Sequence, residues 1–243
     1  MQALKKGMVI IMAGVITHMV IAREMLKALP KGIIQNEALL CLGTLAPDAI
    51  HAREGYVREH KKHTHLRDDI LDKDFIKPES QTLFHERVAE FILENRERKD
   101  GLLDLYRGYV IHLLTDELFM LSIREEFREK MEKLGIDQYD KEFFQYIVTD
   151  QNRNDLLLVK NYEGIDEIRR WMEEVPIYPI DGYLSENEMR ISREWMIRHH
   201  FIEDNELLDP MFISYERILE FIKMATKNIL ERLSEGGSLP RML

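Results

Sequence analysis

The stretch GYVIHLLTD at residues 108–116 is apolar on nearly every side, yet it contains two ionisable residues, His112 and Asp116. A helix places these two side chains on one face, because they lie four residues apart. The apolar flanks predict that this helix, which we expect over Leu102–Ile123, is buried. A buried aspartate costs free energy unless a cation or a hydrogen-bonded base accompanies it. The stretch therefore predicts a core helix that holds either a metal site or a structural pair of histidine and aspartate.

The rest of the chain carries the same helical signal. With only 12 glycines and 7 prolines in 243 residues, and no convincing run of alternating β-branched residues, the sequence predicts an all-α fold. Further helices are expected over Ala3–Leu29, Gln35–Leu45, Leu83–Asn95, Lys141–Thr149, Ile165–Glu174, Glu186–His200 and Ser214–Leu233. The breaks between them are too short for interdomain linkers, so residues 1–243 are expected to form one multi-helix domain. Residues 235–243 are expected to be a flexible tail.

The amino terminus and the only cysteine bear on the location of the protein. Lys5 and Lys6 precede an apolar run that resembles a signal peptide, but the run lacks a clean cleavage site and is too short to span a bilayer. We interpret it as the start of the first core helix. Cys41 has no second cysteine to pair with and is expected to be a buried apolar residue. These features predict a cytoplasmic protein without a transmembrane segment.

The charge balance limits the partners that the sequence favours. Acidic residues outnumber basic ones by 44 to 34, which gives a formal net charge of −10. Such a chain repels a polyanion, so duplex nucleic acid is not an expected partner. Phosphate chemistry remains compatible with this charge, because a bound divalent cation reverses the local field. Nothing in the sequence indicates the oligomeric state.

Histidines are concentrated in the first half of the chain, where seven of the nine precede residue 113. Imidazole and carboxylate groups together form the ligand set that zinc and related ions prefer. His18 is a polar residue within an apolar helix, so it is either a metal ligand or a core histidine with a hydrogen-bonding partner. Asp48 follows Ala46-Pro47 and is either a carboxylate presented to a pocket or the N-cap of the next segment.

The densest group of histidines lies at residues 60–69, HKKHTHLRDD. His63 and His65 are alternate residues and cannot share a helix face, so we expect one of them to be a ligand and the other to be peripheral. His51 and His85 are further candidates for the surroundings of a metal site, or for alternative ligands.

The order of these elements resembles that of the zinc-dependent phospholipase C family, a helical group related to the fungal single-strand nucleases. The resemblance covers about residues 14–120 and rests on Thr17-His18, on LGTLAPD at residues 42–48, on His65-Leu66-Arg67 and on GYVIHLLTD at residues 108–116. It implies a metal site built from this half of the chain. Asp48, His65, His112 and Asp116 would bind one zinc ion, with Asp116 bridging towards a second ion at His18.

The resemblance also implies a reaction, the hydrolysis of a phosphodiester or phosphomonoester by a metal-activated water, with Asp48 as the general base. The expected substrate is a small phosphoester or a phospholipid head group. The secreted members use an amino-terminal tryptophan as a ligand, whereas this sequence starts with Met1. They also use further histidines, but no histidine lies between His112 and His199. One or two ions are therefore expected, zinc first, with manganese or iron as alternatives. The competing hypothesis is a helical binding module whose metal is structural and not catalytic.

Overall fold

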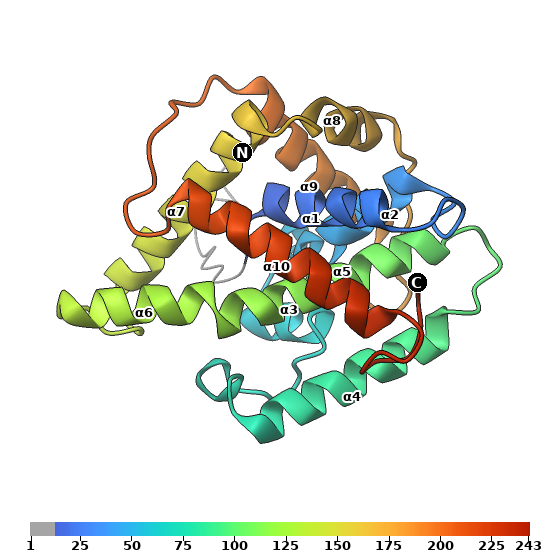
Figure 1. Cartoon of the computed structure of the whole chain (residues 1–243), viewed down its shortest axis with the longest axis horizontal. Coiled ribbons are helices and arrows are strands. Elements are labelled where there is room, and N and C mark those ends of the chain that lie inside the picture. Colours follow the sequence, from blue (N-terminus) through green and yellow to red (C-terminus); the bar gives the residue numbers. More distant parts are fainter. Residues whose placement is uncertain (1–12) are drawn as a thin grey trace.

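The computed structural model describes residues 13–243, and helices dominate it (Figure 1). The α-helices are α1 (Val15–Ala28), α2 (Glu37–Leu45), α3 (Arg58–Thr64), α4 (Pro78–Asn95), α5 (Leu103–Leu121), α6 (Ile123–Lys133), α7 (Lys141–Asn161), α8 (Ile165–Glu174), α9 (Glu186–Ile197) and α10 (Tyr215–Leu233). Two short 3₁₀-helices, η2 (Ala46–Ala52) and η3 (Asp72–Asp74), and a π-helical turn, η4 (Arg198–Ile202), join some of them. Apart from an isolated bridge between Ile180 and Leu184, residues 13–243 contain no β-structure. The prediction of an all-α fold is confirmed.

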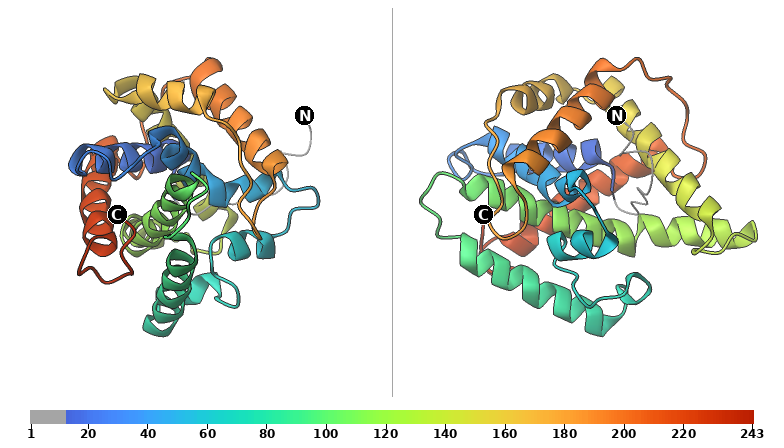
Figure 2. Two further views of the ribbon diagram at one scale, coloured as in Figure 1. Left: turned by 90° about the vertical axis from the view of Figure 1, so that its right-hand side faces the viewer. Right: turned by 180° about the vertical axis from the view of Figure 1, so that it is seen from behind.

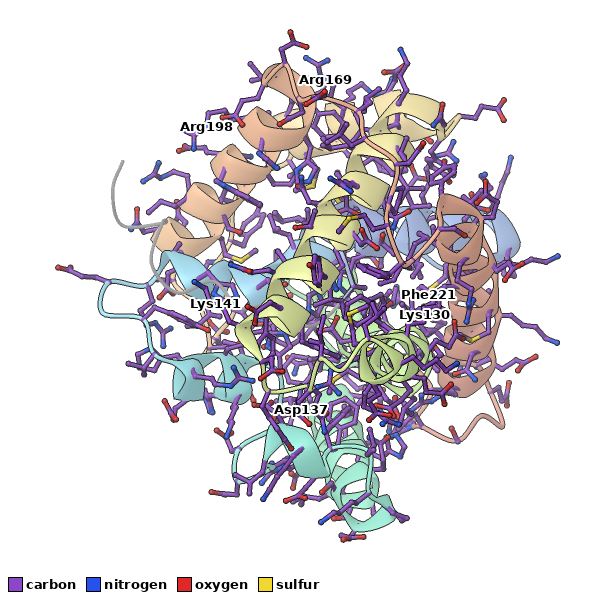
Figure 3. All side chains as sticks on the ribbon, turned by 90° about the vertical axis from the view of Figure 1, so that its left-hand side faces the viewer. Lys130, Asp137, Lys141, Arg169, Arg198 and Phe221 are labelled. Atoms are coloured by element: carbon purple, nitrogen blue, oxygen red, sulfur yellow. The ribbon has the colours of Figure 1, made fainter. Side chains whose placement is uncertain are left out.

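Helix α5 is the central element, and most of its side chains are buried, as its apolar sequence predicts. Figure 2 shows it in the middle of the molecule, with α1 and α10 on one side and α4 below. Helix α10 packs against both α1 and α5. At one of these contacts Phe221 of α10 meets Phe119 of α5 edge to face, with ring centroids 5.6 Å apart. Charged side chains lie on the outside instead: Figure 3 shows Arg169 and Arg198 at the outer edge of the molecule, and both are exposed.

Helices α2 and α5 cross at two glycines, Gly43 and Gly108. A Cβ atom on Gly43 would overlap the carbonyl oxygen of Leu105, and one on Gly108 would overlap the carbonyl oxygen of Leu40. Only glycine lets the two backbones approach this closely. The crossing brings Asp48, which lies three residues beyond the end of α2, close to His112 of α5.

Helix α7 runs well past Thr149, where the apolar periodicity of the sequence stops. Its inward face continues with the buried polar residues Asp150, Asn154 and Asp155. These residues bind other segments: Asp150 accepts hydrogen bonds from the backbone of residues 211–213, and Asp155 accepts them from the start of α1. Apolar periodicity therefore predicts only the first part of α7, Lys141–Thr149, because the buried residues beyond it are polar.

The sequence predicts a helix at the first end of the chain and a flexible tail at the other. The first helix was expected from Ala3, but residues 3–12 lie outside the described residues, and α1 begins at Val15. The tail at residues 235–243 was expected to be flexible, whereas Leu239 and Met242 are buried. The backbone N–H of Met242 donates to the carbonyl of Leu233, so the chain folds back onto the end of α10. Apolar side chains at its end therefore fix this segment, despite the glycines that precede them.

Across residues 13–243, no helix combines the length and the apolar character that crossing a membrane requires.

Candidate metal centre

Five of the residues singled out in the sequence converge at the centre of the molecule. His18 lies in α1 and Asp48 in η2. His65 directly follows the last residue of α3, and His112 and Asp116 lie on successive turns of α5. These five are named here the His–Asp cluster. They form two groups of three that share His112, namely His18–His112–Asp116 and Asp48–His65–His112, and in each group the possible ligand atoms lie within 4.8 Å of one another.

The carboxylate of Asp116 is the common partner within the cluster. One of its oxygens, Oδ1, lies 3.2 Å from Nε2 of His18, and the other, Oδ2, lies 3.2 Å from Nε2 of His112. Nε2 of His65 is 3.5 Å from Oδ2 of Asp116 and 3.5 Å from Oδ1 of Asp48. Possible ligand atoms of three histidines and two aspartates thus lie close together. This is the nitrogen and oxygen ligand set that zinc prefers.

Two backbone carbonyls fix the orientation of the rings of His112 and His65. Nδ1 of His112 donates to the carbonyl oxygen of Thr44 at 2.7 Å, and Nδ1 of His65 donates to that of Lys61 at 2.8 Å. A neutral imidazole with its hydrogen on Nδ1 has a bare lone pair on Nε2. The two Nε2 atoms face each other at 3.3 Å, so two lone pairs would meet unless a proton or a metal ion is shared there. Such carbonyl contacts behind the ring are typical of metal-binding histidines.

His18 completes the cluster through its 3.2 Å approach to Asp116, a contact that lacks the geometry of a hydrogen bond. Its ring stacks on that of His112, with centroids 4.0 Å apart and an interplanar angle of 8°. Neither of its ring nitrogens has a hydrogen-bond partner among the described residues, and the same is true of Oδ2 of Asp116, although all three atoms are buried. Buried polar atoms without partners cost free energy in a folded protein, so their presence fits a site made for a ligand.

The electrostatics of the cluster favour a positive charge at its centre. Burial lowers the pKa of His112, but the carboxylates of Asp116 and Asp48 outweigh this, and the net pKa is raised. Burial raises the pKa of Asp116, but His112 and His18 outweigh it and hold that pKa well below its ordinary value. Burial and the neighbouring His112 lower the pKa of His18, which therefore remains neutral at pH 7. One cation among two carboxylates suits this arrangement, and a metal ion can take the place of the proton.

Lys61 belongs to the same site, although no sequence pattern distinguishes it from an exposed lysine. Its side chain is buried, and Nζ donates to Oδ1 of Asp48 at 2.7 Å. Nζ also lies 3.4 Å from Nε2 of His51, which in turn is 3.7 Å from Oδ1 of Asp48. Burial raises the pKa of Asp48, but Lys61 and the histidines outweigh this effect and keep the pKa well below its ordinary value. Of the residues considered for the surroundings of the site, His51 thus contacts the cluster through Asp48.

His63 and His85 lie outside the cluster. His63 is exposed, where Nδ1 meets Oδ2 of Asp68 at 2.9 Å and the ring stacks on Tyr183. His85 binds the buried Glu117 at 2.5 Å. Helix α3 ends at Thr64, so His65 turns inward while His63 stays on the outer face. The structure therefore places His65 with the other candidate ligands, and His63 apart from them.

Comparison of the chain with protein-family models, with curated proteins and with solved structures found no match.

Proposed function

We propose that the protein is a metal-dependent phosphoester hydrolase of the zinc-dependent phospholipase C type, which binds one or two zinc ions in the His–Asp cluster. One observation carries the proposal: the Nε2 atoms of His65 and His112 face each other at 3.3 Å while backbone carbonyls hold both Nδ1 atoms. A buried arrangement of this kind needs a shared proton or a metal ion between the rings, and the two neighbouring carboxylates favour a metal ion. Each three-residue group supplies three protein ligands, the number typical of catalytic zinc sites, in which water takes the fourth position.

The roles of the residues follow from their surroundings. Asp48, His65, His112 and Asp116 would hold the first ion, and His18 with Asp116 would support a second one. When bound, zinc lowers the pKa of water and offsets the negative charge that develops on a phosphate. Asp48 is better suited to be a ligand than the general base, because its Oδ1 already accepts a hydrogen bond from Lys61. A small phosphoester or a phospholipid head group remains the proposed substrate.

The proposal is tested by metal content and by hydrolysis in a matched pair of variants, His65→Ala and His63→Ala. Purified protein, reloaded with zinc, is expected to hold about one or two ions and to hydrolyse bis(4-nitrophenyl) phosphate. His65→Ala should lose the ion and lower kcat/KM at least about 100-fold, because an inner ligand is removed. His63→Ala, two residues away and outside the cluster, should match the wild type.

Two outcomes would contradict the hydrolase. Absence of zinc, manganese and iron after repletion, measured by elemental analysis, would leave the cluster as a buried structural network. Retention of an ion that His65→Ala removes, together with no hydrolysis of any phosphodiester or phosphomonoester tested, would favour the competing function of a binding module with a structural metal.

A further inference from the structure

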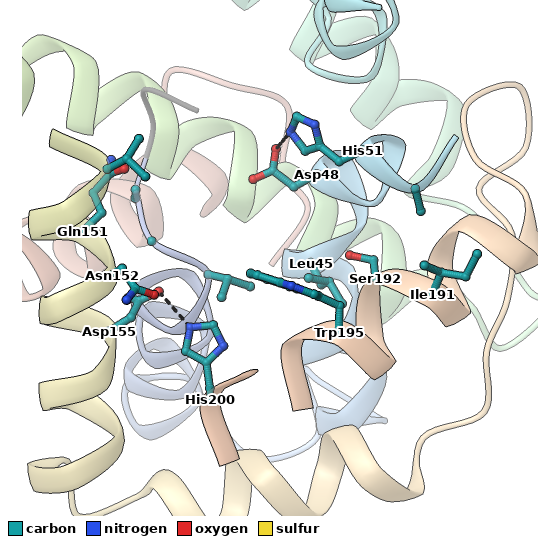
Figure 4. A pocket seen from close by; sticks show the side chains of 15 residues that line it. Leu45, Asp48, His51, Gln151, Asn152, Asp155, Ile191, Ser192, Trp195 and His200 are labelled. Atoms are coloured by element: carbon teal, nitrogen blue, oxygen red, sulfur yellow. Dashed lines mark ion pairs between the residues drawn. The ribbon is translucent and has the colours of Figure 1, made fainter. Parts of the chain in front are cut away.

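A pocket with a cavity volume of about 130 Å³ lies between α7, α9, η2 and the start of α1 (Figure 4). We call it the α7–α9 pocket. Its walls are mainly apolar. They are formed by Ala13, Gly14, Val15, Leu45, Asp48, His51, Ala52, Val148, Gln151, Asn152, Asp155, Ile191, Ser192, Trp195 and His200.

The pocket adjoins the His–Asp cluster at two points. Asp48 belongs to both, since it lines the pocket and its Oδ1 lies 3.5 Å from Nε2 of His65. Ala13 lines the pocket, and its backbone N–H donates to Oδ1 of Asp116 at 3.2 Å. A phosphate held at the cluster would therefore carry its ester group next to the pocket.

Trp195 provides a flat wall. In Figure 4 the indole extends across the pocket between Asp48 with His51 on one side and His200 with Asp155 on the other. The indole stacks on His199, with ring centroids 5.2 Å apart and an interplanar angle of 12°. This contact holds the ring in place, and a fixed aromatic face favours a planar ligand.

The polar groups on the side of the pocket remote from Asp48 are the imidazole of His200, the carboxylate of Asp155 and the amides of Gln151 and Asn152. Nδ1 of His200 donates to the carbonyl of Met196, which leaves Nε2 as an acceptor 3.8 Å from Oδ2 of Asp155. The π-helical turn η4 sets this orientation, and such turns are frequent at functional sites. Both oxygens of Asp155 already accept hydrogen bonds from Ile16 and Thr17.

We propose that the α7–α9 pocket binds the organic group of the phosphoester substrate and selects a compact, uncharged, planar group about the size of one aromatic ring. The proposal rests on the proposed function, because the phosphate must be held at the cluster. The size follows from the volume: an engineered apolar cavity of about 150 Å³ in another protein binds benzene. The preference for an uncharged group follows from the mainly apolar walls and from the occupied carboxylates, since Asp48 is paired with Lys61 and both oxygens of Asp155 already accept hydrogen bonds from the start of α1.

The test compares S-methyl phosphorothiolate diesters whose second ester group is methyl, phenyl, 1-naphthyl or choline. All of them release methanethiol, which a thiol reagent detects, so the leaving group adds no second planar group that could enter the pocket. Zinc-loaded wild type is expected to hydrolyse the phenyl ester with a kcat/KM about tenfold or more above that of the methyl ester. The naphthyl and choline esters should not share this advantage, since the first is too large and the second is charged. Ile191→Trp fills the pocket and should abolish the phenyl preference, so that the phenyl and methyl esters react at similar rates. Glu194→Trp adds the same side chain to the exposed face of α9 and should behave as the wild type.

Equal rates for methyl and phenyl esters, or a preference for choline, would overturn the pocket assignment while leaving the hydrolase intact. Failure of every ester in zinc-loaded protein would instead contradict the proposed function. The pocket is then judged by binding, with Trp171→Phe protein in which Trp195 is the remaining tryptophan. Phenylphosphonate should change the Trp195 fluorescence at a concentration about tenfold or more below that required for methylphosphonate. The same concentration for both probes would overturn the inference.

Discussion

At the scale of single residues, the site depends on buried charges whose partners are far away in the sequence. Lys61 neutralises Asp48 from α3, and Asp155 of α7 holds the first turn of α1 next to His18. Neither residue carries a sequence signal, because an isolated lysine or aspartate in a polar stretch is usually exposed. The ligand candidates are different, since His18, His112 and Asp116 are polar residues within apolar helices, which a sequence alone reveals.

Replacing Lys61 should strengthen metal binding. The ammonium of Lys61 occupies the oxygen of Asp48 that an ion would use, and it repels a second cation nearby. In Lys61→Met we expect the zinc Kd to fall at least about tenfold, measured by calorimetry with metal-free protein. Lys62→Met removes the same charge from a neighbouring position that does not reach the cluster, and it should leave the Kd unchanged. Weaker zinc binding in Lys61→Met would mean that the lysine positions Asp48 for the ion.

Asp155 should make the stability depend on pH. Burial raises the pKa of Asp155 to about 6, although hydrogen bonds from Ile16 and Thr17 oppose the shift. Asp155 in the folded protein then binds a proton more tightly than it does in the unfolded chain. The stability that this proton contributes is fully present below about pH 4 and is lost as the pH rises through about 6. The free energy of unfolding of the wild type, relative to that of Asp155→Asn, should fall by roughly 3 kcal/mol between pH 4 and 7. Chemical denaturation of both proteins at each pH measures this, and a constant difference would contradict the shift.

At the scale of helices, the sequence predicts those elements whose inward face is apolar. Helices α2, α5, α8 and α10 lie close to their expected positions. Helix α3 was not expected, because its sequence REHKKHT has no apolar stripe, and tertiary contacts fix its end. The hydroxyl of Thr64 donates to the carbonyl of Pro47, and Tyr109 donates to the carbonyl of Thr64. The position at which α3 ends determines whether His63 or His65 turns inward. Because contacts with distant residues set that position, the local sequence does not predict which of the two histidines joins the cluster.

At the crossing of α2 and α5, we expect a change from glycine to alanine to destabilise the protein, which is opposite to its usual effect in a helix. In an exposed helix, replacing glycine by alanine stabilises the protein by up to about 1 kcal/mol. Gly108→Ala should instead lower the free energy of unfolding by about 1–3 kcal/mol or more, because the added Cβ overlaps the carbonyl of Leu40. The forced separation of the helices should also weaken zinc binding, since Thr44 of α2 orients His112 of α5. Denaturation and zinc titration measure both effects, and a stabilised variant would show that the crossing tolerates a methyl group.

At the scale of the whole molecule, the cluster residues all lie in the first half of the chain, as the motifs predict, but the second half supports them. Glu117, next to Asp116, is buried between His85 and Arg232 of α10. Helix α7 holds the start of α1 through Asp155, and α9 packs against η2, which carries Asp48. These long-range supports involve charged and polar residues without periodicity, so only the folded chain reveals them. A fragment ending near residue 120 would contain the ligands without the supports that orient them.

The depth of the cluster should also govern the speed of metal exchange. His18, His65 and His112 are each only 1–2% exposed, so we expect a bulky chelator to reach an ion there only when surrounding helices part, whereas a phosphate would approach past Asp48 from the α7–α9 pocket. With increasing chelator, the rate of zinc release should therefore rise to a plateau set by the opening of the protein. A colorimetric chelator followed over time measures this rate, and a rate that stays proportional to chelator concentration would indicate direct access. With a plateau, an ion once acquired would be retained through intervals of metal scarcity shorter than the opening time of the fold.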